Sequence, residues 1–345
     1  MKKPRFFSGL EQRDEGGWYP RHGMVRGGQK VKLSTFALVG TLFLLLMASG
    51  STLVQAQVVD PSNTLLSPVA TEPMGRTLLV EEVTATWCPS CAEIDPYLES
   101  VSDSHGSRIA MVAYHPSDGE DAFQPPAAQH RIQRLSMKHG DAIPSPTFFV
   151  EGNDPRSGID AWNDVQRDIL DLELTRQHVS ILQFEVLRHA EGITARVISM
   201  ETTGLNLNES QLTFLVLEHD KSVPENTINP GGSSRDRVLI ATAECQFNTS
   251  TIETQIGILT SNVSAGCDAD FEITFADKKE FSVILIHEST EHAIENLDAS
   301  LGTYGVVEFA YRTREVPQSW SFTTIALMVS AGAGIVAILP RKVRE

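Results

Sequence analysis

The stretch LLVEEVTATWCPSCAEIDPYLESV, residues 78–101, decides the fold of the first half of the chain. Its opening, Leu78–Thr84, is largely apolar and predicts a buried strand. Its end, Ala92–Val101, predicts a helix, because Ile94, Tyr97, Leu98 and Val101 recur at helical spacing and form one apolar face. Two cysteines, Cys88 and Cys91, therefore fall where a strand gives way to a helix.

This position favours a dithiol that opens and closes as a disulfide. Cys88 is placed at a helix N-terminus, where unpaired backbone N–H groups and the helix dipole stabilise a thiolate. Cys91 lies one turn into the helix, close enough to attack a mixed disulfide formed at Cys88. A zinc site would need two further ligands, and the sequence offers no second C-x-x-C or nearby Cys/His pair. His287 and His292 are five residues apart and would not share a helix face, so we expect no metal site.

Two apolar runs near the ends of the 345-residue chain indicate export and membrane attachment. Residues 1–32 form a basic leader, and residues 33–56 read as a signal peptide or as an uncleaved anchor, with Met1 or Met24 as the start. Residues 320–340 predict a transmembrane helix, and the basic residues 341–345 predict a cytoplasmic tail. We therefore expect a cell-membrane protein, single-pass or with two spans, whose functional domains are extracytoplasmic.

Charge is distributed in the same way. Residues 33–340 hold 17 basic and 40 acidic side chains, whereas both ends of the chain are basic. A region this acidic repels nucleic acid and anionic surfaces, so no nucleic-acid role is expected.

Between the apolar runs the pattern predicts a linker and two domains. Residues 57–75 read as the linker. Residues 76–177 alternate strands and helices, which predicts an α/β domain with a mixed central sheet covered on both faces. Residues 178–316 contain eight short strand-like runs separated by turn residues, which predicts an all-β, immunoglobulin-like sandwich.

The first domain resembles the thioredoxin superfamily over residues 73–177. The resemblance rests on the strand, the Trp87-Cys88-Pro89-Ser90-Cys91 motif, the helix that follows, and Ser145-Pro146-Thr147 at the start of a later strand. It implies a cis peptide bond before Pro146, with Ser145 turned toward an extended substrate peptide beside the dithiol. Pro144 is the competing candidate for that position.

The resemblance also assigns roles around the dithiol. Glu82 matches a buried acid behind the second cysteine, where it could accept the proton of Cys91. Strand alternation puts Glu81 on the opposite face, although both glutamates could also lie at an exposed strand end. Trp87 is expected to shield the dithiol. His115 ends the second strand, either as a structural polar residue or close to the site.

The other cysteines, Cys245 and Cys267, flank predicted strands in the exported region, where disulfides persist. We expect a structural disulfide between them, with a second redox pair as the alternative.

These features predict a membrane-anchored, extracytoplasmic thiol–disulfide oxidoreductase that works through Cys88 and Cys91 without a cofactor. Its partners would be exported proteins that carry thiols or disulfides, and a membrane redox protein that resets the dithiol. The direction of electron flow stays open, because Pro89-Ser90 matches neither the strongly reducing nor the strongly oxidising dipeptide typical of the superfamily. The alternative is a non-catalytic surface protein that uses a thioredoxin scaffold and a β-sandwich to bind a partner.

Overall fold

The computed structural model describes residues 57–105, 108–176 and 179–313. The predicted leader, the signal or anchor segment, the transmembrane helix and the tail lie outside these residues. Within the described ranges, no helix combines the length and the apolar character needed to cross a membrane.

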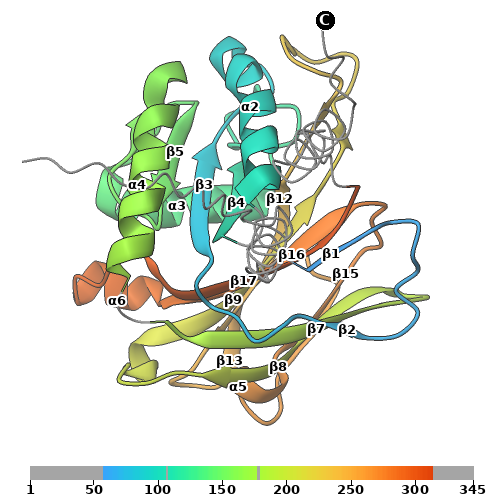
Figure 1. Ribbon diagram of the computed structural model, residues 1–345, viewed down its shortest axis with the longest axis vertical. Coiled ribbons are helices and arrows are strands. Elements are labelled where there is room, and N and C mark those ends of the chain that lie inside the picture. Colours follow the sequence, from blue (N-terminus) through green and yellow to red (C-terminus); the bar gives the residue numbers. More distant parts are fainter. Residues whose placement is uncertain (1–56, 106–107, 177–178, 314–345) are drawn as a thin grey trace, which may run out of the picture. The chain divides into compact units, whose positions relative to one another are not determined.

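Most strands belong to one large mixed sheet of ten strands (Figure 1). From one side to the other it contains β1 (Gln57–Val59), β17 (Thr303–Tyr311), β16 (Phe281–Ser289), β9 (Ser210–Glu218), β12 (Val238–Gln246), β4 (Ile109–Tyr114), β3 (Leu78–Val83), β5 (Thr147–Val150) and β6 (Arg156–Ser157), with β13 (Thr251–Ile256) paired to β12. A second sheet contains β14 (Thr260–Asn262), β15 (Glu272–Phe275), β8 (Gly192–Glu201), β7 (Ile181–His189) and β2 (Val69–Ala70). A short ribbon pairs β10 (Lys221–Ser222) with β11 (Ser234–Arg235).

Helices cover both faces of the sheet around β3, β4 and β5, as the sequence predicted. Side chains of α2 (Pro89–His105) and α4 (Trp162–Thr175) share one core with Leu78 and Val80 of β3. Side chains of α3 (Pro126–His139) share another core with Leu79 and Val83 of the same strand. Because successive strand residues point to opposite faces, β3 is buried on both sides, and four of its six residues are apolar, with Glu81 and Glu82 as the exceptions.

The remaining strands bury a separate core between the two sheets. It contains Phe184 of β7, Phe214 of β9, Phe271, and Phe281 of β16, all fully buried. The helices α5 (Cys267–Asp270) and α6 (Glu291–Asn296) are short. Each of the eight strand-like runs predicted after residue 178 overlaps a strand. Burial alternates along β7 and β15 as expected, whereas β9 and β16 are buried along almost their whole length.

The large sheet continues from the first half of the chain into the second. Val238 at the start of β12 is the partner of Ala113 in β4, and the two strands run parallel. The Ala113 N–H also donates to the carbonyl oxygen of Arg237 at 3.0 Å. The domain boundary predicted between residues 177 and 178 stays a prediction, and strands on either side of it share one sheet.

The prediction that Tyr97 belongs to the buried face of α2 is wrong. Tyr97 is 68% exposed, whereas Ile94 and Leu98 are buried. A helix turns by about 100° per residue, so Tyr97 lies about a quarter turn away from the face that Cys91, Ile94 and Leu98 present to the sheet.

Candidate functional site

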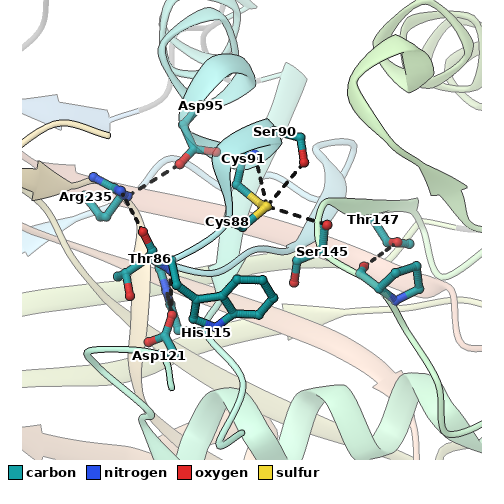
Figure 2. Close-up of a disulfide and its surroundings, with 12 residues drawn as sticks. Thr86, Cys88, Ser90, Cys91, Asp95, His115, Asp121, Ser145, Thr147 and Arg235 are labelled. Atoms are coloured by element: carbon teal, nitrogen blue, oxygen red, sulfur yellow. Dashed lines mark hydrogen bonds and ion pairs between the residues drawn. A yellow bond between two sulfur atoms is a disulfide. The ribbon is translucent and has the colours of Figure 1, made fainter. Parts of the chain in front are cut away.

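The two cysteines of the opening motif form a disulfide at the start of α2 (Figure 2). The Cys88 carbonyl accepts a hydrogen bond from the Ala92 N–H at 3.1 Å, so Cys88 stands just before the first helical turn. Pro89 follows as the first helical residue, where the N–H group that proline lacks would have no helical partner. The sequence prediction that Cys88 sits at a helix N-terminus is confirmed.

Polar groups surround the sulfur of Cys88. The Cys91 N–H donates to Cys88 Sγ at 3.1 Å, and the Ser90 hydroxyl lies 3.4 Å from the same atom. Both groups would also stabilise a thiolate there, because a negative sulfur is a stronger acceptor than a neutral one. Cys88 keeps 2% of its surface exposed and Cys91 keeps none, so Cys88 is the sulfur that a partner can reach.

The segment before β5 lies beside this sulfur. The Ser145–Pro146 peptide bond is cis, as predicted, which decides between Pro146 and Pro144. The carbonyl oxygen of Ser145 lies 3.6 Å from Cys88 Sγ, and Ser145 is partly exposed. Backbone polar groups next to an accessible sulfur can pair with an extended peptide.

An acidic loop braces the motif from the other side. The Trp87 indole donates to Asp118 Oδ2 at 2.9 Å, and the Thr86 N–H donates to Asp121 Oδ2 at 2.7 Å. His115 is fully buried, and its Nδ1 lies 2.9 Å from Asp121 Oδ2. Burial alone would raise the pKa of Asp121, but the His115 and backbone hydrogen bonds lower it to about 2. Asp121 is therefore ionised at neutral pH and fixes the loop against the motif.

Two carboxyl groups, from β3 and α2, line a common cavity close to the dithiol helix. Glu82 is 3% exposed and shares a hydrogen bond with the side chain of Asp95. Asp95 stands four residues after Cys91 in α2, so the two side chains are neighbours on one helix face. Burial raises the pKa of Asp95 to about 6, although the charges of Arg235 and His115 and the hydrogen bond from Glu82 oppose this rise. A carboxyl with such a pKa can exchange protons near neutral pH.

The same carboxyls line a small cavity. Its other polar lining residues include His115, Arg235 and Asp236, and its volume of about 20 Å³ has room for roughly one water molecule. Asp95 Oδ1, His115 Nε2 and Arg235 Nε are buried and have no hydrogen-bond partner among the residues that the structure describes. The cavity thus brings buried polar groups from several elements together.

The two glutamates of β3 lie on opposite faces, as the alternation predicted. Glu81 accepts hydrogen bonds from the Tyr114 hydroxyl at 2.7 Å and from Arg131 Nη2 at 3.1 Å, on the side of α3. It is 1% exposed, so the alternative of an exposed strand end is wrong for both residues. Only Glu82 faces the cavity.

The remaining pair of cysteines is joined as expected. Cys245 of β12 and Cys267 of α5 form a disulfide with a Cα–Cα distance of 5.7 Å, and both are buried. Cys267 begins a helix of only four residues, and the pair lies within the core between the sheets.

A serine, a histidine and an aspartate form a row of hydrogen-bonded side chains, of which Asp236 also lines the cavity. His219 Nδ1 lies 2.6 Å from Asp236 Oδ1, and His219 Nε2 lies 2.8 Å from Ser282 Oγ. Ser282 is fully buried within β16, so no substrate reaches its hydroxyl. These contacts join β16 to the end of β9.

Sequence reasoning missed Asp95 and Arg235. Asp95 carries a signal that can be read, since it follows Cys91 by one helical turn. Arg235 carries no such signal in the sequence, because 144 residues separate it from Cys91 and the pairing of β12 with β4 brings it close to Asp95.

Comparisons with known proteins find no match among families or curated proteins and low similarity to solved structures. No family model matches the chain, and no curated protein matches it. Among solved structures, HBP35 of Porphyromonas gingivalis matches with 16% identity and a TM-score of 0.48, over 71% of this chain and 78% of that one. A structural-genomics protein of Agrobacterium tumefaciens matches with 9% identity and a TM-score of 0.44, over 72% of this chain and all of that one.

Proposed function

We propose that this protein is a membrane-anchored, extracytoplasmic thiol–disulfide oxidoreductase with a thioredoxin-like site built on Cys88 and Cys91. One observation carries the proposal. A disulfide lies at a helix N-terminus, its more exposed sulfur accepts the Cys91 N–H at 3.1 Å, and the Ser145 carbonyl lies 3.6 Å from that sulfur. Thiol–disulfide exchange requires these three features: an electrophilic sulfur, stabilisation of a thiolate and a place for a peptide backbone.

The exchange proceeds in two steps. A client thiolate attacks Cys88 Sγ, the Cys88–Cys91 bond breaks, and Cys91 leaves as a thiolate that takes up a proton. A second client thiolate then attacks the client sulfur and releases Cys88. The client gains a disulfide and loses two electrons, which the dithiol holds until a membrane redox partner removes them. With a client disulfide the same steps run in reverse.

The remaining residues have defined places in this scheme. Glu82 and Asp95 exchange the proton of Cys91 behind the sheet. Ser145 and Pro146 receive the client backbone, and Trp87 shields the disulfide from one side. The Cys245–Cys267 disulfide supports the extracytoplasmic location, because structural disulfides persist in oxidising compartments. The predicted span at residues 320–340 would supply the anchor.

The test is turnover of disulfides by the full chain, purified in detergent. We expect Cys88-dependent reduction of insulin disulfides, or oxidation of a reduced dithiol peptide, and loss of both in Cys88→Ser. The matched control is the double variant Cys245→Ser with Cys267→Ser, which removes the other disulfide. This variant should keep the activity under conditions in which it is folded. Absence of exchange in both directions in the native chain would refute the proposal.

Client capture gives an independent measurement. The Cys91→Ser variant lacks the thiol that resolves the mixed disulfide. Clients should therefore stay bound to Cys88 and be released by dithiothreitol.

A further inference from the structure

Arg235 reaches the back of the dithiol site from the β-rich second half of the chain. It ends the short strand β11, and its side chain is 6% exposed. Its Nε lies 3.6 Å from Asp95 Oδ2, and its Nη2 lies 3.5 Å from the carbonyl oxygen of Thr86 (Figure 2). A residue distant in sequence thus contacts both the strand end and the helix that carry the motif.

The loop before Arg235 holds the guanidinium in place. Its Nη1 donates to the carbonyl oxygen of Gly232 at 2.8 Å, and its Nη2 donates to Asn229 Oδ1 at 2.7 Å. Gly231 packs so tightly that a β carbon there would lie 2.6 Å from Arg235 Nη2 and 3.0 Å from the β carbon of Ala92 in α2. The loop therefore rests on the first turn of α2 and positions the arginine over Asp95.

The start of β12 fixes this loop against the first half of the chain. Arg237, two residues after Arg235, accepts the Ala113 N–H through its carbonyl oxygen at 3.0 Å. A backbone bond within a sheet leaves little freedom to the residues beside it, so the place of Arg235 follows from the continuity of the sheet.

We propose that Arg235 is a positioning residue of the dithiol site, whose guanidinium holds the Asp95 carboxylate behind Cys91 ready to take up the Cys91 proton. The second half of the chain would then complete the redox site in addition to any other role. The proposal rests on the proposed oxidoreductase function.

The step concerned is the resolution of a mixed disulfide between Cys88 and a client. Cys91 loses its proton to the Asp95 carboxylate, and its sulfur attacks Cys88 Sγ. The bond between Cys88 and the client sulfur breaks, the Cys88–Cys91 disulfide forms, and the client leaves as a thiolate. The client sulfur is reduced and the dithiol is oxidised.

Charged groups from every side of the cavity act on Asp95. Glu82 comes from β3, and His115 follows β4. Asp236 and Arg237 lie between β11 and β12, and Arg237 Nη1 pairs with Asp236 Oδ2 at 2.7 Å. Asp236 also pairs with His219, whereas the Nε of Arg235 lies within ion-pair distance of Asp95. Arg235 thus opposes the cost of burying the Asp95 charge, and its positive charge lowers the Asp95 pKa more than that of His115 does.

The experiment compares the native full chain with Arg235→Met and Arg235→Lys. Reduced protein is mixed with a peptide disulfide, and the rate at which the second peptide thiol appears is measured as a function of pH. Loss of the cation should shift the acid limb of this profile upward by about one pH unit, because an opposite charge at this distance lowers a carboxyl pKa by about that much or more. Below the shifted limb the rate should be about tenfold lower. Lysine should restore the profile.

Two controls separate positioning from structure. Arg167→Met removes an exposed arginine that pairs with Asp164 on the surface of α4, and should leave the profile unchanged. In an Asp95→Asn background, Arg235→Met should have no further effect on the acid limb, because the two residues act as one unit. An unchanged acid limb in Arg235→Met would overturn the proposal, as would an equal shift in Arg167→Met.

A measurement without a client keeps the two proposals apart. Titration of Asp95 by carboxyl-carbon NMR in the oxidised full chain should move upward in Arg235→Met and return in Arg235→Lys. If the native chain exchanges no disulfides, the proposed function fails, and this titration still decides whether Arg235 governs Asp95. If exchange is intact but the titration does not move, only the role of Arg235 fails. Should the methionine variant not fold, Arg235→Gln tests the same loss of charge with a polar side chain.

Discussion

Replacing Asp95 by asparagine should change how the stability of the oxidised protein depends on pH. The amide has nearly the shape of the carboxyl group but does not titrate. Asp95 is suited to this test because its side chain is only 16% exposed, and burial raises its pKa from 3.8 to about 6.

The sign follows from proton binding in the two states. The folded protein holds the Asp95 proton up to about pH 6, whereas the unfolded chain releases it near pH 3.8. Between these values the folded state binds more protons, so this group lowers the free energy of unfolding as pH rises. At about 1.4 kcal/mol per pKa unit the full cost is about 3 kcal/mol, of which about 2 kcal/mol falls between pH 4 and pH 7.

The measured quantity is the difference in unfolding free energy between Asp95→Asn and the native chain. Unfolding in guanidinium chloride, followed by tryptophan fluorescence, should give a difference that rises in favour of the variant by about 2 kcal/mol from pH 4 to pH 7. Any pH-independent loss of unfolding free energy that results from removing the partner of Arg235 is the same at each pH, so it does not affect the change of this difference with pH. Asp164→Asn on the exposed surface of α4 is the control and should give a flat difference.

A difference for Asp95→Asn that stays constant across this range would refute the reasoning. It would mean that Asp95 titrates alike in the folded and unfolded chain, and that the carboxyl pair does not hold a proton near neutral pH.

Three other changes should alter stability. Replacing Cys245 and Cys267 together by alanine should lower the free energy of unfolding by about 3 kcal/mol, because the disulfide closes a loop over a sequence separation of 22; loss of less than 1 kcal/mol would contradict this. Glu288→Gln breaks a buried ion pair with two arginines of α3 and should cost about 3 to 5 kcal/mol at pH 7. Since those charges lower the Glu288 pKa to about 2, its stabilisation is present above pH 4.5 and is lost as pH falls toward 2, so the difference between variant and native chain should shrink there. Gly152→Ala should destabilise the chain in thermal unfolding, because φ is +63° and a β carbon would collide with Leu301, whereas Gly119→Ala, at positive φ but with open space, should cost less.

Much of the fold could be predicted because its signals are local. The largely apolar composition of β3 and the alternation in β7 each reflect which faces are buried, and both patterns are visible within ten residues. The dithiol and the opposite faces of Glu81 and Glu82 were accessible for the same reason, whereas the cis bond before Pro146 was an expectation that the resemblance to the thioredoxin superfamily implied.

What sequence reasoning missed depends on contacts between distant segments. The pairing of β12 with β4 involves Val238 and Ala113, which are 125 residues apart, and neither carries a local sign of its partner. Arg235 follows from that pairing. The prediction for Tyr97 was wrong for another reason. Its spacing fits a helix, but its side chain lies beside the buried face that contains Ile94 and Leu98 rather than on it.

The parallel pairing of β12 with β4 also limits how the chain can be divided. A fragment that ends near residue 177 would keep the dithiol and all of β4 but would leave one side of β4 without its neighbouring strand. The fragment would lose the partners of Ala113 at the end of β4, and an unpaired edge of an apolar strand recruits other chains. Such a fragment is therefore expected to aggregate rather than to act as a minimal redox module. Transplanting the motif-bearing segment into another protein would meet the same obstacle, since it arrives with an open strand that only the rest of this chain is shaped to cover.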